Sequence, residues 1–184
     1  MVTLCICSDE EDAEKFRKNI LGQAYFLRGL SYFVMTRVWG DVPLVTTTYE
    51  DPLTAPQLPR SPKTEVYAQI EKDAQMAASL LNWGYQNAGD WGVIANKGSA
   101  YALLAHFYLW RGTMKNVNSS QPDMQDINSA DTAINRIMTM GGYTLTDTSR
   151  YYNTFIGKST EGIFELAASE DNLEGSAGHI GMSF

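Results

Sequence analysis

The chain has 184 residues, of which 44% are hydrophobic, and this length and composition predict one globular domain with a sizeable buried core. Its 14 Lys and Arg residues against 21 Asp and Glu residues give a formal net charge of −7, which excludes a nucleic-acid-binding surface because phosphate binding needs a basic stripe. This charge is compatible with a neutral ligand such as a sugar, and no apolar run of about 18 residues, as a transmembrane segment would need, is present.

Two cysteines, Cys5 and Cys7, lie near the start of the chain. A metal or redox site there would need further Cys or His ligands, and the chain has only two histidines. We therefore expect residues 1–8 to be poorly ordered, like the Ser-, Gly- and acid-rich residues 167–184. The sequence predicts no metal site and no cofactor.

A long helix is the first predicted element, and it ends before Gly40 and Pro43, which favour a left-handed C-terminal turn and prevent continuation. Within it, Gly22 indicates the close approach of another helix. Apolar side chains recur at steps of three and four in two adjacent stripes, so we expect the helix to have neighbours on two sides. The first stripe comprises Ala13, Phe16, Ile20, Ala24, Leu27, Ser31, Val34 and Val38, and the second comprises Phe26, Leu30 and Phe33.

Three more helices are predicted, the second of the chain beginning with Ser61 as its N-cap. The third covers about residues 96–111, and the polar residues 112–128 that follow are expected to form an exposed loop. Ser129, or Asn128, is expected to cap the fourth helix.

Residues 155–157 and 161–166 are strand-like and are expected to form at most a short β-hairpin near the C-terminus. The second and third helices should form an antiparallel pair that the first and fourth flank. The predicted fold class is therefore all-α, a tetratricopeptide-like helical array with long loops, although the strict tetratricopeptide sequence pattern is absent.

The segment from Trp83 to Gly92 is the most suggestive stretch for a ligand, because it has aromatic and polar residues but no helical or strand period. Flat aromatic faces stack on the apolar face of a pyranose, while amide and carboxylate groups bind its hydroxyls. The alternative is that one or both tryptophans fold back to close the seam between helices. The candidate glycan-contact residues are Trp83, Tyr85, Asn87, Asp90 and Trp91.

Catalysis has no support in the sequence, which lacks the common nucleophile-elbow, phosphate-loop, dinucleotide-binding and zinc-protease motifs. A glycosidase needs two facing carboxylates, and Asp90 has no partner that spacing identifies. His106 lies in a predicted helix without a second ligand at metal-binding spacing. We expect a protein that is not an enzyme.

Four segments resemble, in the same order, the characteristic segments of the SusD/RagB family of outer-membrane lipoproteins, which bind glycans beside a TonB-dependent transporter. They are FLRGLSYFVMTRVWGDVPLV at 26–45, RSPKTEVYAQIEKDAQMAASLL at 60–81, NKGSAYALLAHFYLWRG at 96–112, and ADTAINRIMTMGGYTL at 130–145 followed by EGIFEL at 161–166. Together they extend over roughly residues 16–166 and form a specific signal, whereas each alone is mostly helix-packing chemistry.

This resemblance implies that residues 1–184 are a single SusD-like helical domain, a fragment of the family's longer fold. It implies an outer-membrane, cell-surface location, a polysaccharide or oligosaccharide ligand and a SusC-like TonB-dependent transporter as partner. The residues before Cys5 show neither a signal peptide nor a lipobox. The alternative hypothesis is a non-enzymatic, tetratricopeptide-like protein–protein interaction module.

Overall fold

The computed structural model of the protein describes residues 10–49, 56–85, 89, 91–114 and 121–166. The termini that the sequence predicts to be poorly ordered, 1–8 and 167–184, lie outside these ranges.

The chain divides into two compact units. The first is formed by Met1–Gly84 with Ala95–Gly142, and the second by Tyr85–Ile94 with Tyr143–Phe184. That residues 1–184 act as a single domain stays a prediction.

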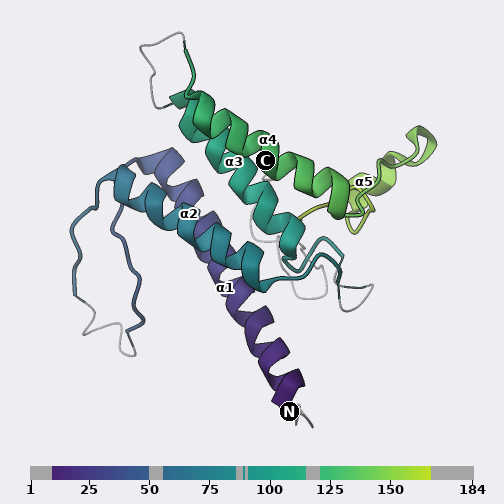
Figure 1. Cartoon of the computed structure of the whole chain (residues 1–184), viewed down its shortest axis with the longest axis horizontal. Helices are drawn as coiled ribbons and strands as arrows, with labels where there is room; N and C mark the ends of the chain where they lie inside the picture. The colour runs from purple at the N-terminus through teal and green to yellow at the C-terminus, as the bar shows by residue number, and fades with distance from the viewer. Residues whose placement is uncertain (1–9, 50–55, 86–88, 90, 115–120, 167–184) are drawn as a thin grey trace, which may run out of the picture. The chain divides into compact units, whose positions relative to one another are not determined.

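Four long helices make up the described part of the first unit, with neighbours along the chain in contact. Figure 1 shows that each runs in the opposite direction to the one before it. The predicted all-α, tetratricopeptide-like array is thus confirmed, with the middle two helices as its antiparallel pair. Within the described ranges, no helix combines the length and the apolar character needed to cross a membrane. The helices are α1 (Glu10–Trp39), α2 (Lys63–Leu80), α3 (Lys97–Met114) and α4 (Met124–Met140).

One of the two predicted apolar stripes of α1 faces away from the other helices. The first stripe is exposed throughout, including Phe16 at 57% and Val38 at 65%, so the expected neighbour on that side is absent from the described residues. The prediction that the second stripe packs against neighbouring helices is largely confirmed, because Phe26 and Phe33 are buried. Periodicity identified the helix but not its buried face, which also includes polar and small residues. The buried residues of α1 are Gly22, Phe26, Gly29, Tyr32, Phe33 and Thr36.

Two glycines allow α2 and the residue after it to lie close against α1. A Cβ atom built at Gly22 would be 2.7 Å from Cγ of Leu81, and one at Gly29 would be 3.3 Å from Cβ of Asp73. The close approach predicted from Gly22 is confirmed.

A bidentate ion pair joins the same two helices. Arg28 donates from Nε and Nη2 to the two carboxylate oxygens of Asp73, with both distances 2.7 Å. The Asp73 side chain is fully buried, and Gln69 donates a further hydrogen bond to it. The hydrogen bonds to Asp73 raise the pKa of Arg28, against the opposing effect of burial.

The connection from α1 to α2 begins at Gly40, whose φ of 71° confirms the predicted left-handed turn. The prediction that Ser61 is the N-cap of α2 is wrong, because Pro62 occupies that position. The backbone N–H of Ser61 instead donates to the carbonyl of Val42 at 3.0 Å. Asp41 accepts a 2.8 Å hydrogen bond from the backbone N–H of Lys63, so a side chain from the preceding connection supplies the missing cap.

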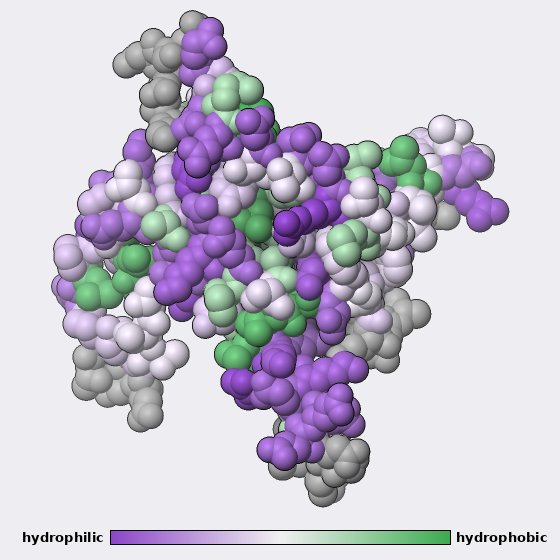
Figure 2. All heavy atoms as spheres, in the orientation of Figure 1, coloured by the Kyte–Doolittle hydropathy of each residue, from purple (hydrophilic) through white to green (hydrophobic). Residues whose placement is uncertain are grey.

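The start of α4 differs from the prediction. Asp123 caps it by accepting a 3.1 Å hydrogen bond from the backbone N–H of Gln125, so the helix begins within the polar segment predicted as a loop. Its buried face is narrow, because Ala130 and Ala133 are buried while Met138 is 75% exposed. Figure 2 shows a mostly hydrophilic surface with smaller apolar areas on the face in view.

The second unit contains the short 3₁₀ helix η2 (Thr148–Arg150) and α5 (Tyr152–Ile156), and the predicted hairpin is absent from its described residues. Asp147 accepts a 2.8 Å bond from the backbone N–H of Ser149, which caps η2 and lowers the pKa of Asp147. Helical turns therefore replace the first predicted strand, because a short apolar run fits either element.

We expect Gly22→Ala to lower the free energy of unfolding by about 1–3 kcal/mol through overpacking against Leu81, although alanine favours an isolated helix by about 1 kcal/mol. The measurement is urea denaturation followed by circular dichroism. Ser31→Ala, at an exposed position of α1, is the control and should be neutral or slightly stabilising. A Gly22→Ala variant at least as stable as the parent would contradict the close approach.

Candidate functional site

The candidate glycan-contact residues belong to different parts of the molecule. Trp83 is in the first unit, whereas Tyr85 and Trp91 are in the second. Asn87 and Asp90 lie outside the described residues. The contacts of the three aromatic residues show which of their faces are already used by the protein.

Trp83 is half-buried and stacks on Tyr101 of α3, with ring centroids 5.5 Å apart and an interplanar angle of 16°. Its carbonyl accepts a 2.9 Å hydrogen bond from the side-chain amide of Asn96. Beside it, the backbone N–H of Lys97 donates to the carbonyl of Asn82 at 2.8 Å. One face of the indole is therefore used to anchor the chain to the start of α3.

Tyr85 and Trp91 contact each other in the second unit, with ring centroids 5.1 Å apart. Trp91 also makes a T-shaped contact with Tyr143, with ring centroids 6.4 Å apart, and the hydroxyl of Tyr85 donates to the carbonyl of Ile163 at 3.3 Å. The indole nitrogen of Trp91 is buried and has no hydrogen-bond partner among the described residues. Trp91 is half-buried, so part of it remains accessible to a ligand.

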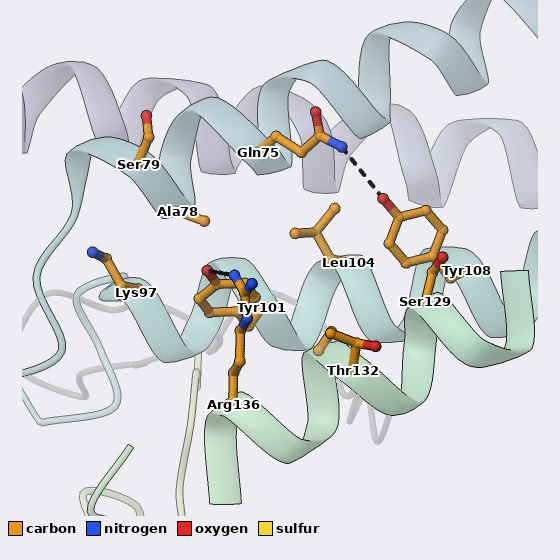
Figure 3. Close-up of a pocket in the computed structure, with 11 residues that line it drawn as sticks. Gln75, Ala78, Ser79, Lys97, Tyr101, Leu104, Tyr108, Ser129, Thr132 and Arg136 are labelled. Atoms are coloured by element: carbon orange, nitrogen blue, oxygen red, sulfur yellow. Dashed lines mark hydrogen bonds between the residues drawn. The ribbon is translucent and has the colours of Figure 1, made fainter. Parts of the chain in front are cut away.

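Sequence reasoning missed a cavity of about 550 Å³ in the first unit, among α2, α3 and α4. Figure 3 shows side chains from all three helices around it. The sequence feature that could have indicated the cavity is the spacing of its four α3 residues, which places them on one helix face: Lys97, Tyr101, Leu104 and Tyr108. The residues that line the cavity are Gln75, Ala78 and Ser79 from α2, Lys97, Tyr101, Leu104 and Tyr108 from α3, and Ser129, Thr132, Ala133 and Arg136 from α4.

An ionic cluster lies one helical turn beyond Tyr108. Arg111 of α3 donates from Nε and Nη2 to both carboxylate oxygens of Asp126 on α4, at 2.8 and 2.6 Å, and from Nη1 to Glu71 on α2 at 2.6 Å. Tyr108 donates to Glu71 at 2.9 Å. The hydrogen bond to Asp126 is the main cause that raises the pKa of Arg111, whereas burial raises the pKa of Tyr108.

Arg136 occupies the opposite end of the cavity, where α4 passes Tyr101. Its Nη1 donates to the Tyr101 hydroxyl at 2.5 Å, and its guanidinium carbon lies 5.2 Å from the centre of the same ring. Lys97, one helical turn before Tyr101, also lines this end. The cavity thus presents cations, hydroxyl groups and an amide around apolar side chains.

The described residues contain no group of three or more His, Cys, Asp or Glu side chains that could hold a metal ion. His106 is exposed on α3. The arrangement of polar groups and rings in both units is suited to non-covalent binding.

A family described as starch-binding and associating with the outer membrane matches residues 3–109, more than half of the chain. The chain belongs to this SusD-like family. The expectation drawn from the four sequence segments is confirmed.

Curated and solved relatives agree with this membership. A SusD-like protein P2 of Formosa agariphila is 31% identical over 102 residues, which are 55% of this chain and 19% of that protein. A solved SusD superfamily protein from Bacteroides vulgatus is similar with a TM-score of 0.70 and 27% identity, over 86% of this chain and 30% of that one. NanU of B. fragilis gives a TM-score of 0.69 and 25% identity, over 86% and 30%. This chain spans less than a third of each relative.

We expect Arg111→Lys to lower the free energy of unfolding by about 1–3 kcal/mol, because one ammonium cannot replace a bidentate bond to Asp126 and the bond to Glu71 together. Urea denaturation measures the change. The control is Arg17→Lys, which alters an exposed pair with Glu14 and should leave the unfolding midpoint nearly unchanged. Equal effects of the two substitutions would show that the Arg111 cluster has no special role.

Proposed function

We propose that this protein captures polysaccharide or oligosaccharide at the bacterial outer membrane and passes it to a SusC-like TonB-dependent transporter. The observation that carries the proposal is the family match over residues 3–109, since the family is described as starch-binding and associating with the outer membrane. The transporter partner and the surface location are part of the proposal.

Capture needs binding without bond cleavage. An exposed part of an aromatic ring stacks on the apolar face of a sugar ring, and polar groups nearby bind its hydroxyls. Trp83, Tyr85 and Trp91 are the aromatic residues that we propose for this role, with Asn87 and Asp90 as the polar groups of the same segment. The half-exposed state of the three rings supports the assignment. We propose that the protein has no enzymatic activity.

A second candidate function is protein–protein interaction through the helical array. It is favoured by the exposed apolar stripe of α1, which is unusual for a helix of a globular protein. The large hydrophobic members of the stripe are Phe16, Ile20, Leu27, Val34 and Val38. These two functions are compatible, because a capture protein that serves a transporter also needs a docking face.

Tryptophan fluorescence during titration with a panel of polysaccharides tests the capture function. We expect a saturable change in the parent protein that is lost in the double variant Trp83→Ala/Trp91→Ala, because a stacked sugar displaces water from the indoles. Trp110→Phe, on α3, is the control and should retain the response. Circular dichroism establishes that each variant is folded.

No response of the folded parent to any polysaccharide would contradict glycan capture. A response that persists unchanged in the double variant would leave capture in place but move the site away from Trp83 and Trp91.

A further inference from the structure

The cavity among α2, α3 and α4 has two chemically different ends. Lys97, Tyr101, Leu104 and Tyr108 follow one another along one face of α3, so the first two mark one end and Tyr108 marks the other. Because α4 runs antiparallel to α3, Arg136 lies at the Tyr101 end and Ser129 toward the Tyr108 end.

At the Tyr108 end, the polar groups are matched within the protein. The side-chain amide of Gln75 donates to the Tyr108 hydroxyl at 3.4 Å, drawn as a dashed line in Figure 3. The Tyr108 hydroxyl in turn donates to Glu71, which also accepts a hydrogen bond from Arg111. Arg111 is bonded to both carboxylates of this cluster, Glu71 and Asp126, and two carboxylates share one cation there, so an anionic ligand would gain little by competing for it.

Cations without carboxylate partners define the Tyr101 end. None of the residues that line the cavity is Asp or Glu, and neither Lys97 nor Arg136 takes part in an ion pair among the described residues. By contrast, Arg28 and Arg111, which also bridge helices, each hold a bidentate carboxylate. The contrast is notable in a chain with a net charge of −7.

Arg136 is positioned for a ligand by its contact with Tyr101. The hydrogen bond to the Tyr101 hydroxyl uses one guanidinium nitrogen, and the ring restrains the group from one side. The remaining N–H groups of a guanidinium bind a carboxylate in a shorter and stronger hydrogen bond than they make with water or a hydroxyl.

The rest of the cavity suits a saccharide rather than an apolar ligand. Leu104, Ala78 and Ala133 provide apolar contact area. The hydroxyls of Ser79 and Ser129 donate to backbone carbonyls, and the amide nitrogen of Gln75 donates to Tyr108, so these side chains offer a saccharide their acceptor oxygens. Its volume of about 550 Å³ falls within the range of about 300–1,000 Å³ that is usual for small-ligand sites.

We propose that this cavity binds an acidic saccharide, with the carboxylate of a uronic acid unit held between Lys97 and Arg136. This proposal rests on the proposed capture function, and it names a substrate class and a site other than the Trp83–Trp91 segment. Binding involves no covalent step.

Isothermal titration calorimetry of the full chain tests the proposal, with oligogalacturonide as the probe and a neutral galacto-oligosaccharide of equal length as comparison. We expect the acidic chain to bind at least about tenfold more tightly, because charge-assisted hydrogen bonds are roughly twice as strong as neutral ones. Its affinity should fall as salt is raised, since the site is open to solvent.

Two variants locate the site. Arg136→Gln and Lys97→Met should each weaken oligogalacturonide binding by about tenfold, with little change for the neutral chain. Lys97→Met also guards against misfolding, because the hydrogen bond that Lys97 makes within the described residues uses its backbone N–H. Lys72→Gln, which removes an exposed cation of α2 outside the cavity, is the matched control and should bind like the parent.

Each remaining outcome overturns the proposal. Equal affinity for the acidic and neutral chains, or full affinity in both variants, would show that the two cations do not bind a carboxylate. Equal binding of a polyglutamate peptide of the same charge would replace the saccharide by an acidic peptide. If neutral chains bind and acidic chains bind no more tightly, the capture function stands and this inference fails. If no saccharide binds, both the capture function and this inference are contradicted.

Discussion

Arg111 satisfies two carboxylates at once, one on each neighbouring helix, and the arrangement of α2, α3 and α4 depends on it. Gly112 follows it, where a Cβ would be 2.9 Å from that of Asp126, so the same turn of α3 supplies both the charge and the space for α4. Because a guanidinium presents its donors in a rigid fork, the pairings fix the direction as well as the distance of the two helices. The cavity follows from this constraint: the helices are held at the Tyr108 end, and their side chains leave room along the faces that continue toward Tyr101.

We propose binding chemistry in two places. The Tyr85–Trp91 contact belongs to the second unit and offers partly exposed rings, as a neutral sugar requires. The cavity of the first unit offers positive charge and hydroxyl groups, as an acidic sugar requires.

The fold could be predicted from the sequence because helix period, glycine and proline positions and the order of the four segments all agreed. The buried face of α1 could not, because Tyr32 and Thr36 are buried while the more apolar Phe16 and Val38 are exposed, and periodicity does not state where neighbours lie. The start of α4 was missed because Asp123 stands within a polar segment, where a capping residue looks like any loop residue. The cavity was missed since it depends on α2 and α4 residues that only helix packing brings near Lys97 and Tyr101.

The hydrogen bond from Lys97 to Asn82 closes the first unit where the chain leaves for Tyr85–Ile94 and returns. The amide of Asn96 and the carbonyl of Trp83 form a second bond across the same junction. These bonds hold the two ends of the intervening segment side by side, so the length of that segment does not affect the packing of the helices. The entropic cost of a longer loop grows only slowly with its length. An insertion between Trp83 and Asn96 is therefore expected to leave these two bonds, and with them the start of α3, in place.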